Sequence, residues 1–176
     1  MIIMIAGVYG VGKSTVCRKL SDEMQLNFYS ASELIKKEKG SSSWDKSKKT
    51  DQIGNNQKYL MAAIKKIACE DFLLDGHFCV INKKGFIENI NLSTIKKIGI
   101  GAVLLLKEDP DIIALRLLSR DEVVWEKNLI AEMQENEIRQ AKKFANENLI
   151  PYAIVDTKNY SGIKNHIMTF FSSKDK

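Results

Sequence analysis

The stretch that decides the fold is MIIMIAGVYGVGKST, the first fifteen residues of the chain (Met1–Thr15). Its apolar part, Ile2–Ala6, is a continuous run of the kind that forms a strand buried on both faces of a parallel sheet. A glycine-rich turn follows at once, and apolar side chains that recur four apart predict a helix over residues 14–25. A strand that leads through such a turn into a helix predicts an α/β fold.

The turn, residues 7–14, matches the pattern G-x-x-x-x-G-K-[ST], which is the phosphate-binding P-loop. Glycines allow backbone N–H groups to converge on phosphate oxygens, and the helix dipole favours the same negative charge. Lys13 is expected to reach the β- and γ-phosphates, Ser14 to bind Mg²⁺, and Thr15 to bind the α-phosphate. The residues predicted to hold a nucleoside triphosphate in this loop are Gly7, Gly10, Val11, Gly12, Lys13, Ser14 and Thr15.

Strands and helices alternate along the rest of the chain. Further strands are predicted at residues 26–29, 72–75, 102–106 and 152–156, with a short extended stretch at 78–81. Helices are predicted at residues 32–39, around 59–67, and at 92–98, 109–119, 122–148 (as one or two helices) and 161–171. This alternation predicts a parallel sheet between two layers of helices, in a single domain over residues 1–172 with a tail at 173–176.

Composition narrows the class of protein. With 44% hydrophobic and 28% charged residues, the chain has the balance of a globular protein, and its apolar runs are too short to span a membrane. Three widely spaced cysteines predict reduced thiols and a cytoplasmic protein. The net charge of +5 comes largely from lysine clusters that contain one aromatic residue, Trp44, and this pattern does not predict a nucleic-acid partner. The sequence does not predict the oligomeric state.

The carboxylate after the second buried run separates classes of P-loop protein. It stands in Leu73-Leu74-Asp75-Gly76-His77, without the Asp-Glu pair of many ATPases, and the guanine-reading motif Asn-Lys-x-Asp is absent from the chain. Asp75 is predicted to hold Mg²⁺ through a water or to orient the phosphate acceptor. A capping aspartate in a turn is the alternative.

Arginines at 116 and 120 are four residues apart on one predicted helix, and Arg139 follows on the next. Cations that surround the transferred phosphoryl group stabilise the transition state, so these side chains are predicted to act there. The predicted catalytic residues are therefore Lys13, Arg120, Arg116 and Asp75. In the alternative interpretation the arginines are surface residues that form ion pairs with Asp121, Glu122 or Glu137.

Taken together, the Gly7–Thr15 loop, Asp75-Gly76-His77 and the 109–121 segment resemble the small nucleoside monophosphate kinases, and the layout is most similar to adenylate kinases of the archaeal type. The resemblance implies a three-layer fold with a five-stranded parallel sheet in the order 2-3-1-4-5. It implies ATP as the nucleotide, with Arg116 among its contacts, and a small-molecule phosphate acceptor. It also implies an acceptor region at about residues 30–70 and a lid at about 116–140.

The acceptor region departs from the pattern of that family. Residues 30–70 contain no arginine to grip a monophosphate, and Asp51-Gln52 stands where one is expected. Lysines at 36, 37, 46, 48 and 49 are weaker substitutes, because lysine lacks the bidentate fork of arginine. Candidate acceptor contacts are Ser32, Gln57, His77 and Arg139. Two functions stay open: a small-molecule kinase, or a nucleotide-sensing regulatory ATPase on a kinase fold.

Overall fold

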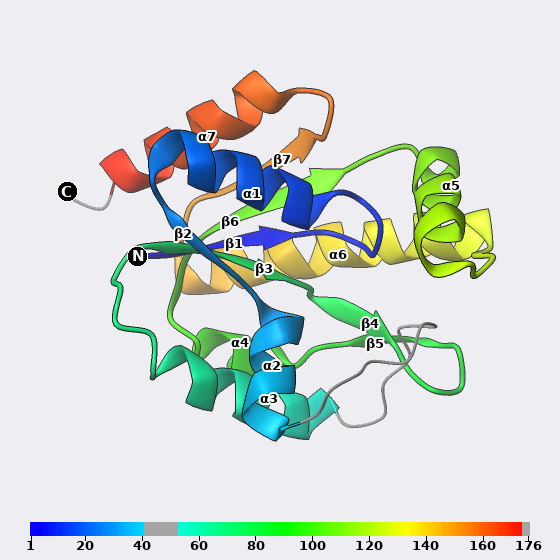
Figure 1. The fold of residues 1–176 in the computed structure, drawn as a ribbon, viewed down its shortest axis with the longest axis horizontal. Helices are drawn as coiled ribbons and strands as arrows, with labels where there is room; N and C mark the ends of the chain where they lie inside the picture. The colour runs from blue at the N-terminus through cyan, green and yellow to red at the C-terminus, as the bar shows by residue number, and fades with distance from the viewer. Residues whose placement is uncertain (41–52, 174–176) are drawn as a thin grey trace.

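A computed structural model describes residues 1–40 and 53–173 (Figure 1). Five parallel strands form the central sheet in the order β2-β3-β1-β6-β7, which is the predicted order once a separate hairpin is left out of the count. The strands are β1 (Ile2–Ala6), β2 (Asn27–Ser30), β3 (Phe72–Gly76), β6 (Ile100–Lys107) and β7 (Tyr152–Asp156).

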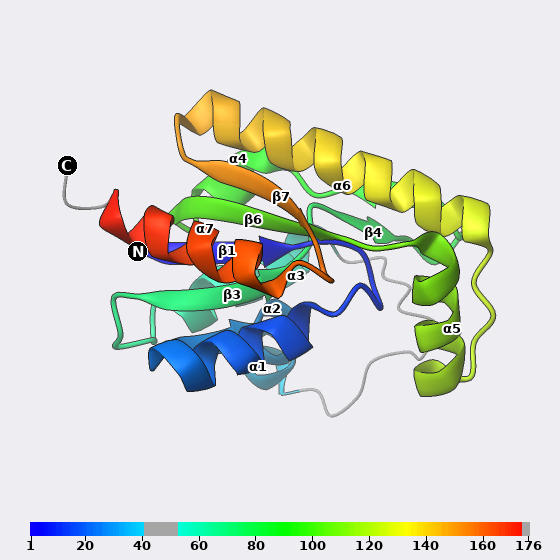
Figure 2. The same cartoon turned by 90° about the horizontal axis from the view of Figure 1, so that it is seen from above.

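Helices cover both faces of the sheet, which confirms the three-layer α/β architecture (Figures 1 and 2). Alternate side chains of β1 separate the two cores: Ile3 and Ile5 pack toward α1 and α7, whereas Met4 and Ala6 pack toward the opposite helices. One face carries α1 (Lys13–Met24) and α7 (Tyr160–Ser172), and the other carries α2 (Ala31–Lys39), α3 (Ile53–Ile64), α4 (Leu92–Lys96) and α6 (Lys127–Asn148). No helix in the described ranges combines the length and the apolar character needed to cross a membrane.

The remaining helix, α5 (Pro110–Asp121), stands at the end of the sheet beside the P-loop (Figure 2). It begins where the sequence predicts, because the side chain of Asp109 accepts a hydrogen bond from the N–H of Asp111 at 2.8 Å and Pro110 occupies the first turn. Residues 122–148, predicted as one or two helices, contain the single 22-residue helix α6 after a short connection.

The extended stretch at 78–81 proves to be half of a hairpin. Strands β4 (Cys79–Ile81) and β5 (Ile87–Asn89) pair antiparallel and form a second, two-stranded sheet. A turn at residues 83–85 joins them, and the side chain of Asn82 accepts hydrogen bonds there from two backbone N–H groups. Periodicity over three residues could not show this pairing.

The parallel strands all direct their carboxyl ends to one edge of the sheet, where ligands bind in α/β folds of this kind. The strand register pairs Ile5 with Asp75 and Asp75 with Ser30, so the ends of β1, β3 and β2 meet there. The P-loop, Asp75 and the start of α2 therefore share one edge, although up to 70 residues separate them in the sequence.

Candidate active site

A cleft of about 1020 Å³ opens at this edge. The P-loop lines its centre, and two groups of polar side chains line the rest. The "α5 side" consists of Glu108, Arg116, Arg120, Thr157 and Lys158, whereas the "α2–α3 side" consists of Ser30, Ser32, Glu33, Asn56 and Gln57; Arg18 on α1 also lines the cleft. A cleft of this size has room for a nucleotide and a second small molecule.

Glycines in the P-loop are required by close packing and by backbone conformation. Gly7 has φ +142° and lies so close to β6 that a Cβ atom would stand 2.7 Å from the carbonyl oxygen of Leu106. Gly10 has φ +74°, and a Cβ there would lie 2.8 Å from Cγ of Leu117 on α5. Both conformations are ones that residues with a side chain rarely adopt. The loop is thus held in shape by β6 below and α5 beside it.

Three predicted residues meet at the centre of the cleft. The Lys13 ammonium donates hydrogen bonds to the carbonyl oxygens of Gly7 (2.8 Å) and Val8 (3.1 Å), and it lies 3.8 Å from Oδ1 of Asp75. The Ser14 hydroxyl donates to Oδ2 of Asp75 at 2.7 Å. A hydroxyl and a carboxylate side by side are hard oxygen ligands suited to Mg²⁺, which is usually held by one or two carboxylates together with phosphate oxygens. The donor set therefore fits Mg²⁺, with Ser14 and Asp75 as the residues that could hold it.

His77 also lies at this centre, next to Glu137, a residue that sequence reasoning missed. Its Nε2 lies 3.3 Å from Nζ of Lys13, and its ring packs against that of Tyr9, tilted by 53° with centroids 4.5 Å apart. Its Nδ1 lies 3.3 Å from Oε1 of Glu137, but this buried nitrogen has no hydrogen-bond partner among the described residues. Burial, and then the Lys13 ammonium, lower the pKa of His77 below its usual range, which favours the neutral imidazole.

Glu137 lies on α6 and is fully buried. Both its carboxylate oxygens accept the N–H of Phe78 at 3.0 Å, and one also accepts the N–H of Cys79 at 3.2 Å. The carboxylate thereby fixes the chain as it leaves β3 for β4, directly after Asp75. A signal in the sequence was available: Glu137 interrupts the apolar stripe that Ile130, Met133, Ala141 and Phe144 form on α6. A carboxylate within such a stripe faces the core.

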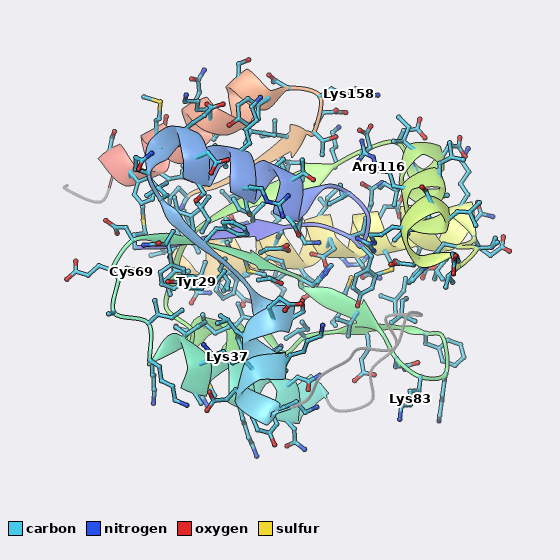
Figure 3. The ribbon with its side chains drawn as sticks, in the orientation of Figure 1. Tyr29, Lys37, Cys69, Lys83, Arg116 and Lys158 are labelled. Carbon is cyan, nitrogen blue, oxygen red and sulfur yellow. The ribbon has the colours of Figure 1, made fainter. Side chains whose placement is uncertain are left out.

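Glu108 organises the α5 side, and it too was not predicted. Its side chain is 1% exposed and accepts hydrogen bonds from the hydroxyl of Thr157 (2.6 Å), the N–H of Asp109 (2.9 Å) and Arg116 (3.2 Å), while Lys158 lies 3.3 Å away. Figure 3 shows Arg116 and Lys158 approaching this end of the sheet from α5 and from the β7–α7 loop. Burial alone would raise the pKa of Glu108, but the bonds from Thr157, Asp109 and Lys158 lower it to about 2.

The predicted arginines differ in their placement. Arg116 bonds the carbonyl oxygen of Val11 in the P-loop at 3.0 Å as well as Glu108, so it ties α5 to the loop. Arg120 lines the cleft, but its guanidinium forms two bonds with Asp121, at 2.9 and 2.6 Å, which is the ion pair of the alternative interpretation. Arg139 bonds Asn136 on its own helix and is not among the residues that line the cleft.

The predicted lid is only partly at the cleft. Its largest part, α6, buries an inner face that includes Ile130, Met133, Ala141 and Phe144. Of the described residues 116–140, only Arg116 and Arg120 line the cleft, both from α5. The apolar side chains of α6 explain why this helix packs on the sheet and does not line the cleft, because their burial requires the sheet to cover them.

On the α2–α3 side lie Ser32 and Gln57, which the sequence predicts to contact the acceptor. Both line the cleft. The hydroxyl of Ser32 bonds that of Ser30 at 2.9 Å, and Glu33 forms an ion pair with Lys36 at 3.3 Å. The predicted acceptor residues Asp51 and Gln52, and the lysines at 46, 48 and 49, lie outside the described residues. Sequence reasoning missed Arg18, which lines the cleft from α1.

Comparisons with known proteins identify a family for the chain and a fold that it shares with solved structures. No curated protein matches the chain. Similar solved structures include a shikimate kinase from Acinetobacter baumannii in complex with shikimate, which is 16% identical with a TM-score of 0.63 and covers 98% of this chain and 93% of that one. A shikimate kinase from Aquifex aeolicus is 19% identical, with a TM-score of 0.55 and coverage of 99% and 98%. A gluconokinase from Sinorhizobium meliloti is 14% identical, with a TM-score of 0.53 and coverage of 98% and 91%.

At such low identity these structures show a shared fold, that of the P-loop kinases. A specific relation to the adenylate kinases is not established by them. The family models give a direct assignment, because the model of the AAA domain family AAA_17 matches residues 6–139, from the end of β1 to the middle of α6. The matched range contains the P-loop, Asp75, His77 and Glu137. The chain therefore belongs to the AAA_17 family of AAA domains.

Proposed function

We propose that the protein is a Mg²⁺-dependent kinase that transfers the γ-phosphoryl group of ATP to a small acceptor molecule. The observation that carries the proposal is the arrangement of Lys13, Ser14 and Asp75 at the centre of a cleft with two polar sides. A protein that only bound a nucleotide would not need the second side. The fold shared with kinases that act on small molecules supports the same function.

In the proposed reaction the P-loop holds the triphosphate, with Lys13 turning from the carbonyl oxygens of Gly7 and Val8 toward the β- and γ-phosphates. Bound Mg²⁺ would neutralise phosphate charge, held by Ser14 and, directly or through a water, by Asp75. An acceptor oxygen forms a bond to the γ-phosphorus while the bond from that phosphorus to the bridging oxygen of ADP breaks. A hydroxyl acceptor also gives up its proton, whereas a phosphate acceptor is already nucleophilic.

Arginines on α5 would supply charge on the opposite side of the phosphates. Arg116 is already fixed beside the P-loop by Val11 and Glu108, and it is suited to contact the nucleotide. Arg120 is about half exposed and bonded to Asp121, so it would have to exchange this partner for a phosphoryl oxygen. Such an exchange has a cost, because the side chain of Asp121 is only 10% exposed and would lose one of its partners.

The resemblance to nucleoside monophosphate kinases suggests a nucleoside monophosphate as the acceptor. The solved structures of similar fold add small hydroxy acids as a second class of candidate acceptor. A nucleotide-sensing ATPase is the second candidate function. The bond between Arg120 and Asp121 favours it, since a charge-stabilising arginine is occupied within the protein.

A coupled assay of ADP release separates the two functions. The purified protein is incubated with ATP and Mg²⁺ and with a panel of nucleoside monophosphates, nucleosides, sugars and hydroxy acids. A kinase releases ADP in a saturable manner that depends on one class of acceptor, and the phosphorylated product appears in equal amount. Slow ADP release that is indifferent to every compound would refute transfer and leave the ATPase.

A further inference from the structure

Some basic side chains in the cleft form hydrogen bonds or ion pairs with other groups of the protein, whereas one of them does not. Within residues 1–40 and 53–173, five of them line the cleft: Lys13, Arg18, Arg116, Arg120 and Lys158. Four are bonded to carbonyl oxygens or carboxylates of the protein. Arg18 has no hydrogen bond or ion pair with any described residue. Its guanidinium, with five N–H donors in a planar fork, is free to bind an anion.

Among the described residues that line the cleft, a second polar side chain has no partner within the protein. Gln57 on α3 is only 7% exposed and lines the cleft, yet no described residue forms a hydrogen bond with its amide. Its neighbour Asn56, equally buried, accepts a bond from Lys39 at 3.2 Å. The amide atoms of Gln57 still reach solvent in the cleft, since neither is among the described buried side-chain atoms that lack a partner. An open amide that faces a cleft is available to hydrogen-bond a ligand there in place of water.

The position of Arg18 suits a molecule that reacts at the P-loop. Arg18 follows Ser14 by four residues on α1, so both side chains project from one face of the helix, about 6 Å apart along its axis. The Ser14 hydroxyl bonds Asp75, which shows that this face looks toward the end of β3. A small acceptor can therefore reach the γ-phosphate at one end and Arg18 at the other.

We propose that Arg18 and Gln57 form the acceptor subsite, and that it takes an acceptor bearing an oxyanion, either a carboxylate or a phosphate. This inference rests on the proposed kinase function. Arg18 binds the oxyanion with its guanidinium fork, and Gln57 hydrogen-bonds a polar group elsewhere on the same molecule. The arginine that the acceptor region lacks in sequence is thus supplied by α1. The acids on this side do not oppose the anion, because Glu33 is already paired with Lys36.

The first test compares matched pairs of acceptors with the wild-type protein, ATP and Mg²⁺. Nucleoside monophosphates are paired with their nucleosides, and hydroxy acids with their amides, so that each pair differs in the anion. The anionic member should give the higher kcat/KM, by about ten-fold or more, which is the value of a hydrogen bond to a charged group. Whichever class of pair reacts shows whether the anionic group of the acceptor is a phosphate or a carboxylate. Equal or faster transfer to the neutral members would overturn the subsite and leave the kinase function standing.

The second test uses variants and the acceptor found in the first. Arg18→Gln should raise the KM of the anionic acceptor about 10- to 100-fold and leave the KM of ATP unchanged, and Arg18→Lys should fall between it and the wild type. Gln57→Leu should also raise the acceptor KM. Lys142→Gln, an exposed change on α6, is the matched control and should change nothing. Thermal unfolding checks that each variant is folded.

Two results would contradict the assignment of Arg18, and a third would contradict the kinase function as well. An unchanged acceptor KM in Arg18→Gln would show that the guanidinium does not hold the acceptor. An equal rise in the KM of ATP and of the acceptor would place Arg18 at the nucleotide instead. If ADP release in the wild type ignores every compound of the panel, the kinase function and the subsite are both wrong.

Discussion

Replacing Glu108 by glutamine removes the charge at the centre of the α5 side while keeping the size of the side chain and one acceptor oxygen. The pKa of Glu108 falls from an ordinary value of 4.5 to about 2 in the folded protein. A difference of about 2.5 units corresponds to about 3 kcal/mol, at about 1.4 kcal/mol per unit. The Glu108→Gln variant should therefore be less stable by up to about 3 kcal/mol at pH 7, a large part of the stability of a domain.

The pH dependence of this loss has a defined sign. Because folding lowers the pKa of Glu108, its contribution is complete above about pH 4.5 and is lost as the pH falls toward 2. Glutamine does not titrate. The difference between wild type and variant should thus stay constant from pH 7 to about 5 and narrow at lower pH.

Urea denaturation followed by circular dichroism measures this difference at a series of pH values. With a slope of about 2 kcal/mol per molar urea, the midpoint of the variant at pH 7 should fall by about 1.5 M. Glu132→Gln, at an exposed position on α6, is the control and should change stability by less than about 0.5 kcal/mol. A loss below about 1 kcal/mol in Glu108→Gln, or one that does not vary with pH, would refute the account of Glu108 as a charged, buried hub.

Four further changes test the centre of the cleft. Lys13→Ala should abolish ADP release while circular dichroism shows a retained fold, and normal turnover would contradict the assignment of the P-loop. Arg120→Ala should lower kcat about 10- to 1000-fold with a smaller change in the KM of ATP, and an unchanged kcat would leave Arg120 as a partner of its neighbouring carboxylate alone. Gly10→Ala should lower the melting temperature by several degrees, since a positive φ costs about 1 kcal/mol and the new methyl meets Leu117. Glu137→Ala should cost about 3 kcal/mol or more in urea denaturation, because two buried N–H groups lose their acceptor; a loss near zero would contradict its buried role.

The part of the site that lies on a continuous stretch of sequence could be predicted. The P-loop places Lys13 and Ser14 by local geometry, and the end of the next buried strand places Asp75 beside them. The sheet order and both helical layers follow from the same alternation of strands and helices. Local pattern is sufficient here because each functional residue is an immediate neighbour of a strand end.

The other polar residues of the cleft required contacts between distant segments. Glu108 and Thr157 are 49 residues apart, and Phe78 and Glu137 are 59 apart. Charged residues on helices are usually exposed, so residue type alone gave no reason to single out Glu137 or Arg18 from their charged neighbours. In the case of Glu137, its place in the apolar stripe of α6 was a usable signal. For Arg18 there was none beyond its spacing from Ser14.

The packing of Gly10 against Leu117 links two positions that are 107 residues apart. A methyl group at position 10 would meet the leucine at 2.8 Å, so the size of one residue limits the size of the other. A smaller side chain at 117 would relieve that collision, but the backbone strain of a φ of +74° would persist. Compensation between the two positions is therefore one-sided: position 117 can change while position 10 stays glycine. In a collection of variants selected for function, position 117 should vary while position 10 stays glycine.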